Sequence, residues 1–348
     1  MKELNLIQSP QQALALDQKT QFLDWLQSSP TEEIQSALSH FLITQKSVHT
    51  RRNYGRDISD FLKFCANNSA NVKVLSQIKE EFIHLWKIQL FKNGDKETSV
   101  ARKLAALSSF LNFGVKRGLV AKNVVLLVDR PHISEVSRTN ALTLAEMTDL
   151  LNFLKFNKET LKNSEPKSRK YASAALRYTV IHTLISVGMR VDELCGLYIG
   201  SLEELPDRAR LNLAIKGGYE HTVVIHPQTL AILKAYIQEF RSTCSPNELL
   251  FVRAQNCKNK IQKLTQAAVY QAITESARHA GIATHLSPHS CRATLATLLH
   301  NAGTPIGQIQ DLLGHKRIST TSVYIKKAEE RSQAAAVQLD LLNDCFNK

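Results

Sequence analysis

Long hydrophobic runs are absent from this sequence, and the longest uninterrupted apolar run, residues 124–128, has only five members. A helix that crosses a bilayer needs about 20 apolar residues, so we expect no transmembrane helix. The first residues lack the basic segment and following apolar stretch of a secretory signal. The six cysteines form no CxxC pair, which argues against a disulfide framework and a thiolate zinc site. We therefore expect a soluble, cytoplasmic protein without a bound metal or cofactor.

Glycine and proline are also scarce, with 13 and 9 of them among 348 residues, whereas 43% of the residues are hydrophobic. Such a chain is globular and can bury a sizeable core, and its length favours about two domains. No internal repeat or low-complexity tract is visible.

Positive charge is what the sequence has in excess: 44 Lys and Arg against 31 Asp and Glu give a net charge of +13. Residues 1–50 carry three basic and five acidic side chains, whereas residues 251–300 carry six and one. The excess therefore lies in the body of the chain and not in a basic arm. It favours a polyanionic partner, and the alternative is a generically basic soluble protein.

The hydrophobic pattern divides the chain into a mainly α (α+β) protein of two units. A helical bundle is expected first, then a mostly helical unit with a small antiparallel sheet. Short β-favouring runs at 211–215 and 222–225 flank Lys216 and two glycines, which indicates a hairpin or a three-stranded sheet. The predicted segments are an N-terminal helical extension (1–32), the bundle (33–128), a linker (129–142), the second unit (143–330) and a C-terminal tail helix (331–348).

Two helices of the bundle are predicted from caps and apolar stripes. Thr50 is a candidate N-cap for a helix whose stripe includes Ile58 and Phe61. Thr98 is a candidate cap for a second helix, which Gly118 ends. Arg102 and Lys103 fall off the apolar stripe of this second helix, and so the simplest account is a bundle with a basic outer face.

Four short patterns in the second unit could carry chemistry. Gly188 is expected to end a helix, with Arg190 at the break before the next one. Lys216 lies at the hairpin tip. Ser287 and Pro288 start a helix on which His289 and Arg292 share a face near the N-terminus. Gly314 ends a later helix, directly before His315, and Tyr324 follows nine residues after that histidine.

Each pattern alone is more often structural, but together they supply what phosphodiester transesterification needs without a metal. Guanidinium groups bind non-bridging phosphate oxygens bidentately and stay charged at any working pH. A hydroxyl nucleophile and a proton donor for the leaving oxygen complete the set.

The order of these residues resembles the tyrosine recombinase (phage integrase) family. The likeness rests on three boxes, VGMRVDELCGL, LSPHSCRATLATLLHNAG and LLGHKRISTTSVYIKK, and on two helices of the first unit, SVHTRRNYGRDISDFLKF and TSVARKLAALSSFLNFGVKRG. It spans about residues 33–330 and contains all six catalytic positions in order. The compact layout is most similar to Xer-type recombinases.

This resemblance implies a helical core-binding domain and a catalytic domain that form a C-shaped clamp around DNA. Tyr324 would attack the scissile phosphate and form a 3′-phosphotyrosyl link. Arg190 and Arg292 would bind the non-bridging oxygens with help from His315, while Lys216 would protonate the leaving oxygen and His289 would serve the tyrosine. Neither ATP nor metal would be required.

The implied partner is double-stranded DNA with an inverted-repeat core site. It would be bound by a homotetramer, or by a heterotetramer with a paralogous recombinase, associated with the nucleoid and with no membrane contact. The tail after Tyr324 would dock on a neighbouring protomer, and the alternative is a tail folded back on its own domain. Residues expected to face the DNA are Thr50, Arg51, Arg52, Arg56, Arg102, Lys103, Lys116, Arg117, Lys316 and Arg317.

Several positions depart from the family pattern. Cys291 and Ala293 flank Arg292 where the family usually has Leu and His, and Val124 replaces a proline after Asn123. The glycine that usually precedes the lysine is missing before Lys216. The slightly acidic N-terminal extension is a poor candidate for an additional DNA-binding domain.

Three alternatives stay open or are disfavoured. A type IB topoisomerase shares this chemistry, but the bundle and the box from His315 to Tyr324 favour a recombinase. A DNA-binding protein that does not cut is the non-enzyme alternative. A metal-dependent nuclease is disfavoured because the sequence shows no carboxylate cluster of the two-metal kind.

Overall fold

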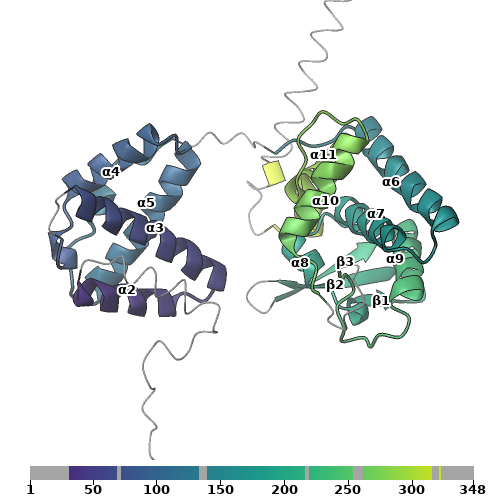
Figure 1. Ribbon diagram of the computed structural model, residues 1–348, viewed down its shortest axis with the longest axis horizontal. Coiled ribbons are helices and arrows are strands. Elements are labelled where there is room, and N and C mark those ends of the chain that lie inside the picture. Colours follow the sequence, from purple (N-terminus) through teal and green to yellow (C-terminus); the bar gives the residue numbers. More distant parts are fainter. Residues whose placement is uncertain are drawn as a thin grey trace, which may run out of the picture. The chain divides into compact units, whose positions relative to one another are not determined.

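The computed structural model describes residues 31–68, 72–132, 139–215, 219–253, 262–315, 321 and 322. The chain divides into two compact units, Met1–Ser134 and Glu135–Lys348. The first is a helical bundle and the second is mainly helical with a small sheet (Figure 1). The mainly helical α+β fold predicted from the sequence is thereby confirmed.

The described residues of the first unit form four helices and two 3₁₀ turns, packed around one apolar core. These elements are α2 (Glu32–Thr44), α3 (Val48–Asn67), η2 (Leu75–Gln77), α4 (Glu80–Lys92), α5 (Glu97–Lys116) and η3 (Val124–Leu127). The two predicted stripes meet where α3 contacts α5, and Ile58, Phe61, Leu104 and Leu107 are fully buried there. The ring of Phe61 meets that of Trp86 edge-on, with centroids 5.1 Å apart.

The predicted caps of α3 and α5 are wrong. Ser47 caps α3, and its hydroxyl accepts a hydrogen bond from the amide of Thr50, which therefore lies inside the first turn. Helix α5 begins at Glu97, one residue before Thr98, and the side chain of its N-cap residue Lys96 makes no capping bond. An acidic residue in a first turn is favourable next to the helix dipole, and Glu97 occupies that position.

In the second unit, α7 contacts α6, α8, α9, α10, α11 and β3 (Figure 1). The helices with described bounds are α6 (Leu144–Ser164), α7 (Arg169–Val187), α8 (Val191–Cys195), α9 (Pro227–Phe240), α10 (Gln266–His279), α11 (Pro288–Asn301) and α12 (Ile306–Leu313), with the 3₁₀ turn η4 (Ile199–Ser201). Twelve residues of α7 are buried, and so this helix forms the centre of the core.

A three-stranded antiparallel sheet in the order β1-β2-β3 interrupts the helices, as the sequence predicted. Its strands are β1 (Leu202–Glu204), β2 (Ala209–Ile215) and β3 (Tyr219–Ile225). The register pairs Leu211 with Val223 and Ile215 with Tyr219. Leu211, Leu213, Val223 and Ile225 belong to the core of the unit, which ties the hairpin to the helices.

Candidate active site

Arg190 lies at the sharp junction between α7 and α8. Gly188 ends α7 in the left-handed conformation, with φ 66°, and Arg190 is the N-cap residue of α8. One carboxylate oxygen of Glu193 accepts the backbone N–H of Arg190 at 2.7 Å, and the other accepts Nη1 of the same residue at 2.7 Å. The Glu193 side chain is only 8% exposed, and so this charge-assisted pair fixes the direction of the guanidinium.

Arg292 lies in the second turn of α11 and is buried, with 2% of its surface exposed. As predicted, Ser287 caps this helix and Pro288 occupies its first position. Nη1 of Arg292 donates to the carbonyl oxygen of Gly188 at 2.6 Å, and Nη2 donates to the carbonyl of Leu313. The second arginine is therefore held by backbone from the end of α7 and from the end of α12.

The turn after α12 brings the two arginines together. Gly314 ends the helix with φ 61°, as the sequence predicted. Nη2 of Arg190 lies 3.5 Å from the carbonyl oxygen of Gly314, next to the Leu313 carbonyl that binds Arg292. Residues about 100 positions apart in the sequence thus meet at one turn.

His315 completes this cluster. Nε of Arg292 donates to Nε2 of His315 at 3.2 Å, and Nδ1 of His315 lies 2.8 Å from the hydroxyl of the fully buried Thr321. Because Nε2 accepts a hydrogen bond from Arg292, the neutral ring carries its hydrogen on Nδ1. Burial, followed by the charges of Arg292 and Arg190, lowers the pKa of His315 to about 4, and so the neutral form prevails at neutral pH.

His289 lies one helical turn before Arg292, on the first turn of α11. It keeps an exposed surface, yet surrounding protein atoms, and then the charges of Arg292 and Arg190, lower its pKa. A neutral imidazole near a helix N-terminus can accept a proton from a nearby hydroxyl.

Two of the six predicted catalytic residues, Lys216 and Tyr324, lie outside the described residues, as do Lys316 and Arg317. The structure thus brings together Arg190, Arg292 and His315, with His289 on the same helix as Arg292. The strands β2 and β3 directly flank the Lys216 segment in the sequence.

The basic residues predicted to face DNA have different surroundings in the first unit. Helix α3 exposes Arg52 and Arg56, and the end of α5 exposes Lys116 and Arg117. Nε of Arg51 donates to the carbonyl of Gln45 at 2.8 Å.

The sequence predicted that Arg102 and Lys103 lie on a basic outer face of the bundle. In the structure, both side chains instead bind acidic residues of the same unit. Arg102 bonds to Asp57, which is fully buried on α3. Nζ of Lys103 donates to Asp95 at 2.9 Å, and its side chain is 14% exposed. Asp57, 45 positions before Arg102, and Asp95, eight positions before Lys103, draw the two side chains toward the bundle.

Sequence reasoning missed several residues that shape the site. Glu193 and Thr321 orient Arg190 and His315, and the carbonyls of Gly188, Leu313 and Gly314 accept from the arginines. The i, i+3 spacing of Arg190 and Glu193 was a usable signal. Backbone acceptors leave no signal in a sequence.

Two absences among the described residues bear on other functions. Within these ranges, no group of three or more His, Cys, Asp or Glu side chains gathers as a set of metal ligands. No described helix has the length and hydropathy that a bilayer span needs.

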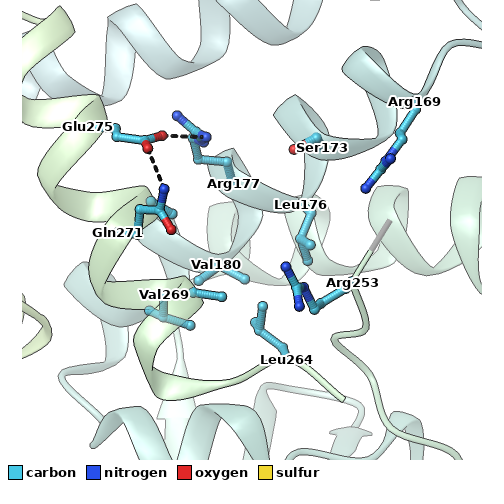
Figure 2. Close-up of a pocket in the computed structure, with 12 residues that line it drawn as sticks. Arg169, Ser173, Leu176, Arg177, Val180, Arg253, Leu264, Val269, Gln271 and Glu275 are labelled. Atoms are coloured by element: carbon cyan, nitrogen blue, oxygen red, sulfur yellow. Dashed lines mark hydrogen bonds and ion pairs between the residues drawn. The ribbon is translucent and has the colours of Figure 1, made fainter. Parts of the chain in front are cut away.

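A pocket of about 210 Å³ lies apart from the cluster, where α7 and α10 meet the segment around Arg253 (Figure 2). In it, Arg177 pairs with Glu275 at 3.1 Å, and Gln271 donates to the same carboxylate at 2.8 Å. The described lining residues include none of the four catalytic candidates, and so this pocket is separate from the candidate active site.

The chain matches known protein families over most of its length. The model of the phage integrase family matches residues 142–331, and the model of the phage integrase N-terminal SAM-like domain matches residues 34–118. The chain is 27% identical over 319 residues to the tyrosine recombinase XerC of Leptospira interrogans, covering 90% of this chain and 95% of that protein.

Solved structures share the fold. XerH recombinase bound to its difH substrate in a pre-cleavage complex matches with a TM-score of 0.65 at 19% identity, covering 92% of this chain and 88% of that one. A lambda integrase tetramer bound to a Holliday junction matches with a TM-score of 0.59 at 16% identity, covering 84% and 76%. Because the family model spans more than half of the chain, this protein belongs to the phage integrase family and is an Xer-like tyrosine recombinase, an enzyme that cuts and rejoins DNA strands.

Proposed function

We propose that the cluster at the α12 turn binds one scissile DNA phosphate and that Tyr324 attacks it. The observation that carries this proposal is the convergence of Arg190, Arg292 and His315 on residues 313–315. Two guanidinium groups at one place, one of them hydrogen-bonded to His315, can hold the non-bridging oxygens of a phosphate as negative charge develops in the transition state.

In the proposed cleavage, the phenol oxygen of Tyr324 forms a bond to phosphorus while the bond between phosphorus and the 5′ oxygen breaks. The phenol proton passes to His289, and Lys216 donates a proton to the leaving 5′ oxygen. The product is a 3′-phosphotyrosyl link and a free 5′ hydroxyl. The phosphodiester is exchanged and not hydrolysed, and so no external energy source is needed for rejoining.

The pKa directions of both histidines support these roles. A lowered pKa leaves His289 neutral at neutral pH, the form that can accept the tyrosine proton. His315 is neutral as well, with a pKa of about 4, and so it acts through hydrogen bonds more than through charge. The permanent charge at the phosphate then comes from Arg190 and Arg292.

We assign residues 33–128 to core binding, 129–142 to a linker and 143–330 to catalysis. The extension 1–32 and the tail 331–348 flank them, and the tail contacts a neighbouring protomer. Among solved structures of the same fold, a lambda integrase dimer is bound to a core site and a lambda integrase tetramer is bound to a Holliday junction. For this chain we propose an inverted-repeat core site, bound in the cytoplasm at the nucleoid by a homotetramer or by a heterotetramer with a paralogue.

The exposed Arg52, Lys116 and Arg117 are the best-placed phosphate contacts of the first unit, and Arg56 is also exposed but pairs with Asp57 at 3.7 Å. Arg51, Arg102 and Lys103 hold intramolecular partners and would contact DNA only by sharing or exchanging them. Binding through several phosphate contacts should weaken steeply with salt.

Covalent trapping tests the proposal. Wild-type protein and Tyr324→Phe are incubated with nicked suicide substrates made from genomic fragments, then denatured and analysed for protein–DNA adducts. We expect an adduct with the wild type and none with Tyr324→Phe. An equal adduct in both would refute Tyr324 as the nucleophile, and binding without any adduct would indicate a missing partner recombinase or a protein that does not cut.

A further inference from the structure

The imidazole of His221, on β3, lies against the turn that ends α12. Its Nε2 is 3.0 Å from the carbonyl oxygen of Leu312. A carbonyl can only accept, and so Nε2 carries the hydrogen and donates it. The ring also packs on the backbone of Gly314, because a Cβ added to that glycine would lie 3.2 Å from Cδ2 of His221. This contact joins the sheet to the turn.

Three successive carbonyls of this turn are bound by three different elements. Leu312 accepts from His221 on β3, Leu313 accepts from Arg292 on α11, and Gly314 faces Arg190 at the start of α8. The carbonyls in the last turn of a helix accept no hydrogen bond from the helix itself, and so they need donors from other segments. His221 therefore holds the same turn as the two catalytic arginines, through the carbonyl that precedes theirs.

We infer that His221 is a positioning residue of the active site, which fixes the 312–314 turn so that its carbonyls hold both arginines at the phosphate. The inference rests on the proposed function of Arg190 and Arg292. Nothing in it requires His221 to touch DNA. Without the Nε2 donor, the turn would lose its hydrogen bond from β3 to the carbonyl of Leu312 but keep its other contacts. The neighbouring carbonyls of Leu313 and Gly314 would then be free to shift.

Matched variants isolate this hydrogen bond. His221→Phe keeps a flat ring against Gly314 but removes the donor, whereas His221→Gln keeps an N–H donor. Thr222→Val is the control, because it removes a hydrogen bond from the next residue of β3, whose hydroxyl donates to Asn212 at 3.0 Å and not to the turn. Each variant is measured for DNA affinity, thermal unfolding and the single-turnover rate of covalent adduct formation.

We expect His221→Phe to slow adduct formation by about tenfold or more, since small displacements of catalytic groups have effects of this size. DNA affinity should stay within about twofold, because the arginines' charges remain. His221→Gln should recover most of the rate, and Thr222→Val should match the wild type. Equal losses in the Phe and Gln variants, or none in His221→Phe, would overturn the inference.

A second substrate separates this role from an effect on Lys216, which follows β2 in the same hairpin. A DNA with sulfur in place of the 5′ bridging oxygen has a leaving thiolate that needs no proton, and so it should rescue Lys216→Ala. The defect of His221→Phe should persist on it, because the arginines are still misplaced. Rescue of His221→Phe would overturn the inference in favour of the hairpin, whereas a wild type that forms no adduct would instead refute the proposed function.

Discussion

Replacing Gly188 by alanine tests how the end of α7 supports the active site. Gly188 adopts φ 66°, and a Cβ placed there would lie 2.7 Å from Cδ2 of Leu313 and 2.8 Å from Cδ2 of Leu295. The left-handed conformation costs a residue with a Cβ roughly 1–2 kcal/mol. Displacing two packed leucines adds about 1–3 kcal/mol, and so the expected loss in the free energy of unfolding is about 2–5 kcal/mol.

A matched control separates the two costs. Gly303 belongs to the same unit and also has a positive φ, 82°, but an added Cβ would meet nothing within 4 Å. Gly303→Ala should therefore lose only the conformational part, about 1–2 kcal/mol. Urea unfolding of both variants measures the difference, which is the packing cost of Gly188→Ala.

Gly188→Ala should also slow DNA cleavage, because it shifts the carbonyls of Gly188 and Leu313, both of which bind Arg292. The rate is measured well below the unfolding temperature. The reasoning fails if Gly188→Ala is no less stable than Gly303→Ala, or if it cleaves as fast as Gly303→Ala.

Two further predictions concern the same cluster, and a third concerns His315 together with the buried His182 on α7. Glu193→Gln removes the charge that orients Arg190 and should slow single-turnover cleavage about 10- to 100-fold; cleavage at the wild-type rate would contradict that role. Thr321→Val removes the hydroxyl at Nδ1 of His315 and should slow cleavage about tenfold, whereas Thr321→Ser, which keeps the hydroxyl, should not. Burial holds the pKa of His182 and of His315 at about 4, below the ordinary value of about 6.5, so the unfolded chain takes up protons first as pH falls. The free energy of unfolding should decrease between pH 6.5 and pH 4 by up to about 3 kcal/mol per histidine. Denaturant titrations at several pH values should show a shallower decrease in His182→Gln than in the wild type. An identical decrease in both would contradict the lowered pKa of His182.

The features predicted well from the sequence depend on local chemistry. The end of α7 at Gly188, the start of α11 at Ser287 and Pro288, and the end of α12 at Gly314 were all identified from cap and turn residues. The apolar stripes of α3 and α5 were buried as expected. The caps at Thr50 and Thr98 failed because Ser47 offered an earlier hydroxyl to α3 and because α5 begins without a side-chain cap.

Contacts between distant segments were beyond the sequence. The pairing of Arg102 with Asp57 joins residues 45 positions apart, and it turns a presumed surface charge toward a buried carboxylate. The convergence at the α12 turn depends on backbone carbonyls, which every residue has and which no residue type marks. Order along the chain identified Arg190, Arg292 and His315 as a set, but only the fold shows which groups hold them.

The most direct test of the central claim is to locate the covalent bond itself. Wild-type protein is trapped on its DNA in the presence of EDTA, the DNA is digested, and the peptides are sequenced by mass spectrometry. The account predicts a nucleotide adduct on Tyr324, formed at the same rate with and without the chelator and lost in Arg292→Ala. An adduct on another residue, or cleavage that stops when metal is removed, would contradict it.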